Sequence, residues 1–96
     1  MVIHLKLFSP LSDAAGAAEL CLSVEEKANL RNLVEALVAR FGGEMKKHLF
    51  DVEGRIIPSW AVFINKRVVP LNQPDALEAQ VEAGDEVSFI LNIAGG

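Results

Sequence analysis

The clearest helical pattern in the chain is residues 29–41, Asn-Leu-Arg-Asn-Leu-Val-Glu-Ala-Leu-Val-Ala-Arg-Phe. Its apolar residues recur three and four positions apart, which places them on one face of a helix. Asn29 is a favourable N-cap, because its side-chain oxygen can accept a hydrogen bond from a backbone N–H of the first turn. Gly42 and Gly43 follow, and glycine readily adopts the positive φ that ends many helices. We therefore predict one amphipathic helix with an apolar stripe of Leu30, Leu33, Val34, Leu37, Val38 and Phe41.

Strand patterns precede this helix. Residues 2–8 carry apolar side chains at positions 3, 5 and 7, and a period of two is typical of a half-buried strand. Residues 20–24 alternate in the same way. Between them, residues 9–18 contain proline, serine, aspartate and glycine, which predicts a loop. Because this connection is short, we expect the two strands to form an antiparallel hairpin.

Strand patterns also follow the helix. Residues 60–64 are a dense apolar run, and Asn65-Lys66 comes directly after them. Asparagine tolerates the left-handed conformation of a tight turn, so we predict a hairpin into residues 67–69. Residues 86–91 alternate again and form the last predicted strand.

The elements occur in the order ββαβ(β)β. This order predicts an α+β fold, with one main helix packed on one face of a mixed sheet of four or five strands. Short helices are expected within residues 44–50 and 75–83. A length of 96 residues corresponds to one domain. We expect residues 1–96 to form that single domain, with residues 92–96 as a flexible tail.

Composition excludes several function classes. The chain has 13 acidic and 9 basic residues and a net charge of −4, so it lacks the basic patch of nucleic-acid-binding proteins and would be repelled by anionic lipid. No stretch approaches the roughly 20 apolar residues of a membrane span. A single cysteine allows neither an internal disulfide nor a cysteine-built metal site. We expect a reduced, cytoplasmic protein that binds no nucleic acid, no membrane and no metal.

The chain also lacks the usual catalytic motifs, such as a P-loop or a nucleophile elbow. We interpret Cys21 as a buried, inert thiol, and His4 and His48 as histidines without a catalytic role. Turn chemistry and solvation explain the adjacent Asp85 and Glu86. No residue is therefore predicted to be catalytic.

Apolar residues exceed what one face of a sheet can bury. Residues 60–64 are apolar at both parities, and Ile90 lies on the face opposite the other apolar residues of its strand. Phe63 and Ile90 are therefore predicted to face outward and to form a partner docking surface, since an exposed apolar patch marks such a surface. The alternative is that residues 44–58, or a loop, cover this face.

The sequence ends in two glycines, Gly95 and Gly96. Because glycine lacks a Cβ atom, such an end can lie in a narrow channel and bring its backbone close to a nucleotide or another protein. Its reactive group is the α-carboxylate, which becomes a good electrophile only after adenylation. A tail of this kind makes the protein a carried substrate. Frayed ends, where glycine is also common, are the alternative.

Several segments together resemble the ubiquitin-like β-grasp sulfur carriers, most closely the small subunit of molybdopterin synthase. The most specific parts are Gly-Asp-Glu-Val at residues 84–87 and the terminal Gly-Gly. Asn65-Lys66 departs from the family's usual Asn-Gly, and Asn92-Ile93 stands where a proline is common. Residues 44–59 are longer than in the compact thiamine-type carriers. The matching segments are Met1–Phe8, Asn32–Leu37, Val62–Asn65, Ala83–Phe89 and Ile93–Gly96.

The resemblance implies a β-grasp fold and a sulfur carrier that is not itself an enzyme. An E1-like activating enzyme would use ATP to adenylate Gly96, and a sulfur donor would convert it to a thiocarboxylate. The chain itself would bind no cofactor. Ile93, Ala94 and Gly95 would lie in the active site of the molybdopterin synthase large subunit. There the carrier would deliver sulfur to a pterin precursor that later holds molybdenum or tungsten.

Three alternatives stay open on the sequence alone. A ubiquitin-related modifier would join Gly96 to a lysine through an isopeptide bond. A carrier for cysteine or thiamine synthesis would differ only in the sulfur acceptor. A plain β-grasp interaction domain would use the outward apolar patch, and its glycines would be frayed ends.

Overall fold

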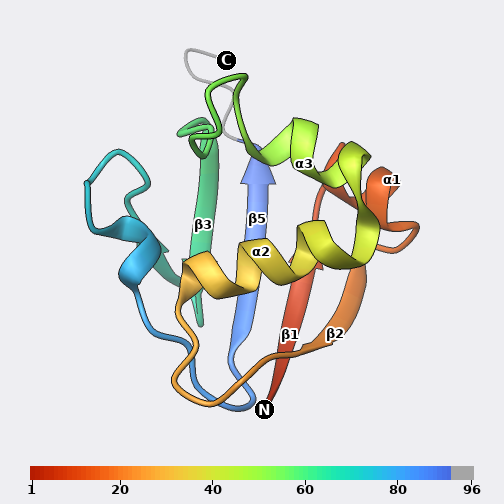
Figure 1. The fold of residues 1–96 in the computed structure, drawn as a ribbon. Helices are drawn as coiled ribbons and strands as arrows, with labels where there is room; N and C mark the ends of the chain where they lie inside the picture. Colours follow the sequence, from red (N-terminus) through yellow and green to blue (C-terminus); the bar gives the residue numbers. More distant parts are fainter. Residues whose placement is uncertain (92–96) are drawn as a thin grey trace.

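The computed structural model describes residues 1–91. They form one five-stranded sheet in the order β2-β1-β5-β3-β4, in which β1 and β5 are parallel and the other neighbours are antiparallel. The last strand in the sequence thus lies at the centre of the sheet (Figure 1). The strands are β1 Val2–Leu7, β2 Glu19–Ser23, β3 Trp60–Ile64, β4 Arg67–Val69 and β5 Glu86–Leu91. The helices are α1 Leu11–Ala15, α2 Leu30–Phe41, α3 Gly43–Leu49 and the 3-10 turn η1 Ala76–Glu78.

Helix α2 lies across one face of the sheet (Figure 1) and confirms the helix predicted from the apolar stripe. The Asn29 side-chain oxygen accepts a hydrogen bond from Asn32 N at 2.9 Å, and Asn29 N donates to Asn32 Oδ1 at 3.0 Å. This reciprocal capping box stabilises the first turn. Gly42 ends the helix with a φ of 79°, a conformation that strains a residue with a Cβ atom. The fully buried residues of the stripe are Leu30, Leu33, Val34 and Leu37.

The hydrophobic core lies between the sheet and its helices. Val62 and Phe89 occupy the centre of the sheet and are completely buried. Helix α3 adds Met45 and Leu49, which are also inaccessible to solvent. Trp60 reaches under α3, where its Nε1 donates a hydrogen bond to the backbone carbonyl of His48 at 2.8 Å. The single polar atom of the indole ring is therefore paired, as a buried tryptophan requires.

Two connections differ from the prediction. The loop predicted at residues 9–18 is interrupted by α1, which buries Leu11 completely. The short helix predicted within residues 75–83 is only one 3-10 turn, η1. The helix predicted at residues 44–50 is confirmed as α3. Among the described helices the longest has 12 residues, and none combines the length and the apolar character needed to cross a membrane.

Candidate functional site

The face of the sheet opposite α2 carries the residues that were predicted to dock a partner. Cross-strand register places Phe63 between Ser88 of β5 and Val68 of β4, and it places Ala61 beside Ile90. Strand residues on the core side alternate with these positions. Phe63 and Ile90 thus share the open face of the sheet, and their role in docking stays a prediction.

We call Ala61, Phe63, Val68 and Ile90 the open-face patch. Val68 is 58% exposed and Ile90 is 37% exposed, whereas Phe63 and Ala61 are half-buried by their neighbours. Sequence analysis missed Val68, although the alternation within residues 67–69 carried the signal. The patch therefore extends across β5, β3 and β4.

Residues 44–58 do not cover the open face. Met45 and Leu49 belong to the core on the helix side, and Ile56 and Ile57 pack against that same core. The alternative in which this segment hides the apolar patch is therefore wrong.

The other half of the open face, formed by β1 and β2, is polar apart from Val2 and includes the lone cysteine. Cys21 of β2 pairs with His4 of β1, and its Sγ lies 3.4 Å from His4 Nδ1. Both residues are exposed, so the interpretation of Cys21 as a buried thiol is wrong. The physical reason is parity, because Leu20 and Leu22 turn toward the core and leave the residue between them outside.

The most specific internal motif of the sequence has a structural role. Asp85 Oδ1 accepts a hydrogen bond from Asn65 Nδ2 at 2.8 Å, and Asp85 Oδ2 accepts one from Glu82 N at 2.8 Å. Asn65 Oδ1 in turn accepts from Glu86 N at 2.9 Å. These bonds clasp the β3–β4 turn to the start of β5. Asn65 and Lys66 both have positive φ, 51° and 71°, as the predicted tight hairpin turn requires.

Strand β5 leads to the predicted tail. It ends at Leu91, which pairs with Trp60 at the beginning of β3 and is 39% exposed. The chain therefore continues from the centre of the sheet, at the edge near α3 and the loop that follows it (Figure 1). Outside the described residues lie those predicted to carry sulfur or to enter a partner: Ile93, Ala94, Gly95 and Gly96.

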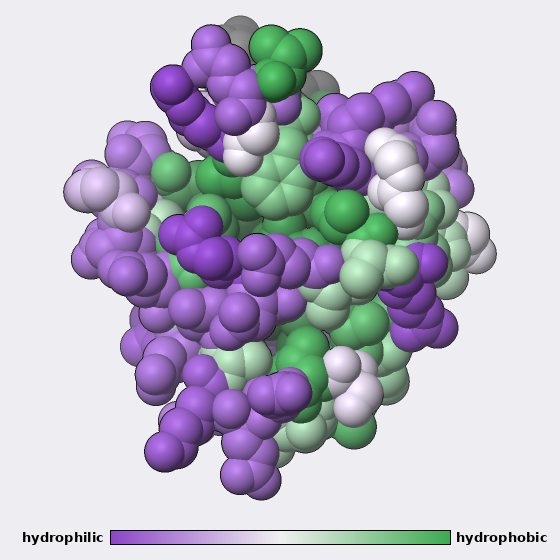
Figure 2. Space-filling model, viewed as in Figure 1, coloured by the Kyte–Doolittle hydropathy of each residue, from purple (hydrophilic) through white to green (hydrophobic). Residues whose placement is uncertain are grey.

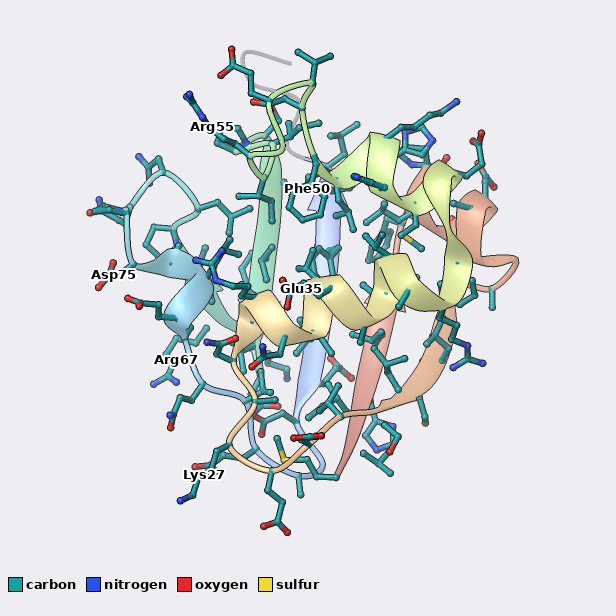
Figure 3. All side chains as sticks on the ribbon, in the orientation of Figure 1. Lys27, Glu35, Phe50, Arg55, Arg67 and Asp75 are labelled. Carbon is teal, nitrogen blue, oxygen red and sulfur yellow. The ribbon has the colours of Figure 1, made fainter. Side chains whose placement is uncertain are left out.

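Residues 1–91 contain no group of three or more histidine, cysteine, aspartate or glutamate side chains that is arranged to hold a metal ion. Charged side chains instead spread over the outer surface, as Figure 3 shows for the labelled Lys27, Glu35, Arg55, Arg67 and Asp75.

The model of the ThiS family matches residues 5–96 of the chain. The chain belongs to this family. It is therefore a member of the sulfur carriers with a ubiquitin-like β-grasp fold. A protein of Archaeoglobus fulgidus that is named as a sulfur carrier is 32% identical over 71 residues, which span 74% of this chain and 77% of that protein.

Solved structures share the fold of this ThiS-family chain. SAMP1 of Haloferax volcanii, a small archaeal modifier protein, superposes with a TM-score of 0.83 at 24% identity over 100% of both chains. A Pyrococcus furiosus protein named as molybdopterin converting factor subunit 1 superposes with a TM-score of 0.73 at 21% identity, over 97% of this chain and 99% of that one. At these identities the likeness establishes the β-grasp fold, which agrees with the predicted fold class.

Proposed function

We propose that this protein carries sulfur on the α-carboxylate of Gly96. Membership of the ThiS family is the observation that supports this most strongly. The two glycines follow the central strand β5 after an interval of three residues, so a partner can bind the tail without pairing with an edge strand of the sheet. On this proposal the folded domain is the part that partner enzymes bind. The chain is then a substrate of those enzymes rather than an enzyme itself.

The proposed chemistry has two steps. A carboxylate oxygen of Gly96 attacks the α-phosphorus of ATP, pyrophosphate leaves, and an acyl adenylate forms. The sulfur of hydrosulfide then attacks the acyl carbon, AMP leaves, and a thiocarboxylate remains. Both steps need a partner enzyme that holds the reacting groups in line, because positioning removes much of the entropic barrier.

We further propose that the sulfur is used to make molybdopterin. This rests on the resemblance to the molybdopterin synthase small subunit and on the shared fold with the P. furiosus protein. Ile93, Ala94 and Gly95 would then enter the active site of a large subunit. The cofactor made there would hold molybdenum or tungsten, and the reaction would take place in the cytoplasm.

The open-face patch is the proposed docking surface for these partners. Val68 and Ile90 expose apolar area that the core does not use, and Phe63 lies between β5 and β4 in the same patch. Interface cores are typically depleted of charge and enriched in aromatic side chains. The patch fits that description, since none of its four residues is charged.

Protein modification is the second candidate function. The fold shared with the Haloferax volcanii modifier favours it. A modifier uses the same adenylate, but the amine of a lysine attacks the acyl carbon and an amide bond forms. The two functions therefore differ in the nucleophile, and the product distinguishes them.

Intact mass spectrometry tests the proposal. The full chain is incubated with the activating enzyme of its own source, ATP and a sulfide donor. We expect a mass gain equal to the exchange of one oxygen for one sulfur, and no gain in a chain that lacks Gly96. Adding the large subunit and the pterin precursor should remove the sulfur again. Conjugates of higher mass would favour modification, and an unchanged mass with an enzyme active on another carrier would contradict both functions.

A further inference from the structure

Residues 50–57 form a small hairpin at the edge of the sheet where β5 ends (Figure 1). Phe50 and Ile56 form an antiparallel bridge. Asp51 N donates to the carbonyl of Arg55 at 2.8 Å. Below the bridge, Ile57 N donates to the carbonyl of Leu49 at 2.8 Å and ties the hairpin to the end of α3.

The turn of this hairpin is internally hydrogen-bonded. Asp51 Oδ1 accepts from Glu53 N at 2.9 Å and from Arg55 N at 3.0 Å. Gly54 closes the turn with a φ of 81°, and its N–H donates to the Asp51 carbonyl at 3.0 Å. Since these bonds already restrict the backbone, a partner that binds the turn has less conformational entropy to remove.

An apolar surface accompanies this ordered turn. Val52 stands at its tip with its side chain fully exposed. Beside it, an open hollow lies between the hairpin and α3, and its wall carries one carboxylate, which accepts two backbone hydrogen bonds of the turn, as well as two lysines. The hollow is lined by Gly43, Lys46, Lys47, Phe50, Asp51, Val52 and Ile57. Figure 2 shows hydrophobic residues gathered between the hairpin, α2 and α3, and Figure 3 places Phe50 among them. Within residues 1–91 no side chain covers this valine, which leaves it free for an external contact.

The charged side chains that line the hollow indicate which charge a partner should place there. Lys47 lies 3.3 Å from Glu44 and is neutralised locally. Lys46 forms no ion pair within residues 1–91. A carboxylate on the partner would complement Lys46, in a protein whose overall charge is −4.

The position of the hairpin identifies the kind of partner. Trp60, three residues after the hairpin, pairs with Leu91, so the hairpin and the start of the tail share one edge of the sheet. Residues 92–96 reach at most about 16–18 Å from Leu91 when fully extended. An enzyme that encloses the Gly96 carboxylate must therefore come within that distance of this edge.

We propose that the 50–57 hairpin is a second contact surface for the enzyme that activates Gly96. In this contact the enzyme places one of its apolar side chains beside Val52 and one of its carboxylates near Lys46. This inference rests on the proposed function, because it needs an enzyme that takes the tail. It adds a binding site on the helix side of the sheet, separate from the open-face patch. The activating enzyme must come close to the hairpin during adenylation, because it must hold the Gly96 carboxylate in line with the α-phosphorus of ATP.

The first test replaces Val52 with aspartate. ATP–pyrophosphate exchange by the activating enzyme is measured against the concentration of the full chain. We expect Val52→Asp to raise the KM for the chain about tenfold and to leave kcat within about twofold. Val2→Asp is the matched control, because Val2 is also exposed, at 47%, but lies at the opposite end of the sheet. Its KM should equal that of the unaltered chain.

The second test reverses the charge at Lys46. Lys46→Glu should raise the same KM about threefold at low salt, and the difference should shrink at high salt because screening weakens the interaction. A KM within twofold of wild type for Val52→Asp, or an equal rise for Val2→Asp, would overturn the hairpin contact. A defect confined to transfer from the finished thiocarboxylate would also overturn it, since the acceptor and not the activating enzyme would then bind the hairpin. If the unaltered chain supports no exchange, the proposed function fails first.

Discussion

The same strands form both faces of the sheet, but the two faces differ in how deeply their apolar side chains are buried. On the helix side, Val62 and Phe89 are completely buried. On the open face, their sequence neighbours Phe63 and Ile90 are apolar as well, yet Ile90 remains 37% exposed. Burial in the core explains why Val62 and Phe89 are apolar. The fold does not require apolar side chains at Phe63 and Ile90. The buried face stabilises the fold, and the exposed apolar residues of the other face are consistent with the proposed docking surface.

A cavity in the core should separate the stabilities of the two faces most clearly. Phe89→Ala should lower the free energy of unfolding by about 3–5 kcal/mol, because the variant loses buried area and leaves a void. Ile90→Ala, one residue away, should cost less than about 1 kcal/mol. Urea unfolding of both variants measures the contrast. Equal losses would mean that the two faces are packed alike.

Loss of the hydrogen bonds of Asp85, which include one from Asn65, should lower the free energy of unfolding by an intermediate amount. Asp85→Ala removes two hydrogen bonds, from Asn65 Nδ2 and from Glu82 N. We expect a loss of about 1–2 kcal/mol in the free energy of unfolding, with sulfur loading retained by the folded fraction. Thermal unfolding and the loading assay together check this. Lost loading in a fully folded variant would show that the motif has a direct role in activation.

Phe63→Asp probes the open face of the sheet. The substitution should cost less than about 1 kcal/mol of stability, because the side chain lies outside the core, but should weaken binding of the activating enzyme at least tenfold. Ser23→Asp, on the polar side of the same face, is the charge control and should bind normally. Calorimetric titration measures both. An unfolded Phe63→Asp variant would contradict the assignment of this residue to the open face.

Removal of Gly96 should have the smallest effect on stability. The melting temperature should stay within about 1 °C of the unaltered chain, since terminal residues generally contribute little packing. Sulfur loading should nevertheless disappear. Differential scanning calorimetry and intact mass measure the two properties. A large drop in melting temperature would show that the tail packs on the domain.

Residue patterning predicted most of the architecture. The stripe of α2 and the alternation of β1, β3 and β5 depend on which residues face the core, and that information is local to each element. The tight turn at Asn65 and Lys66 was predictable for the same reason, because asparagine readily adopts the positive φ that such a turn requires.

Features that depend on tertiary contacts escaped prediction. Helix α1 has five residues and buries one of them fully, Leu11, so no periodicity could reveal it. The exposure of Cys21 was misjudged because cysteine is usually buried, although the alternation of Leu20 and Leu22 contained the answer. Residue type predicts the turn at Asp51 to Gly54, and the hydrogen bond from Gly54 N to the Asp51 carbonyl confirms it. The bridge between Phe50 and Ile56, which makes residues 50–57 a hairpin, could not be predicted in this way.

We propose above all that the Gly96 α-carboxylate carries the sulfur and that the folded domain presents it to partner enzymes. The most direct measurement is sulfur loading of a chain extended by one alanine after Gly96, followed by intact mass beside the unaltered chain. We predict an unchanged melting temperature and no sulfur gain, because the extension displaces the carboxylate and adds a Cβ atom at the end of the channel. Sulfur gain at the rate of the unaltered chain would contradict the claim.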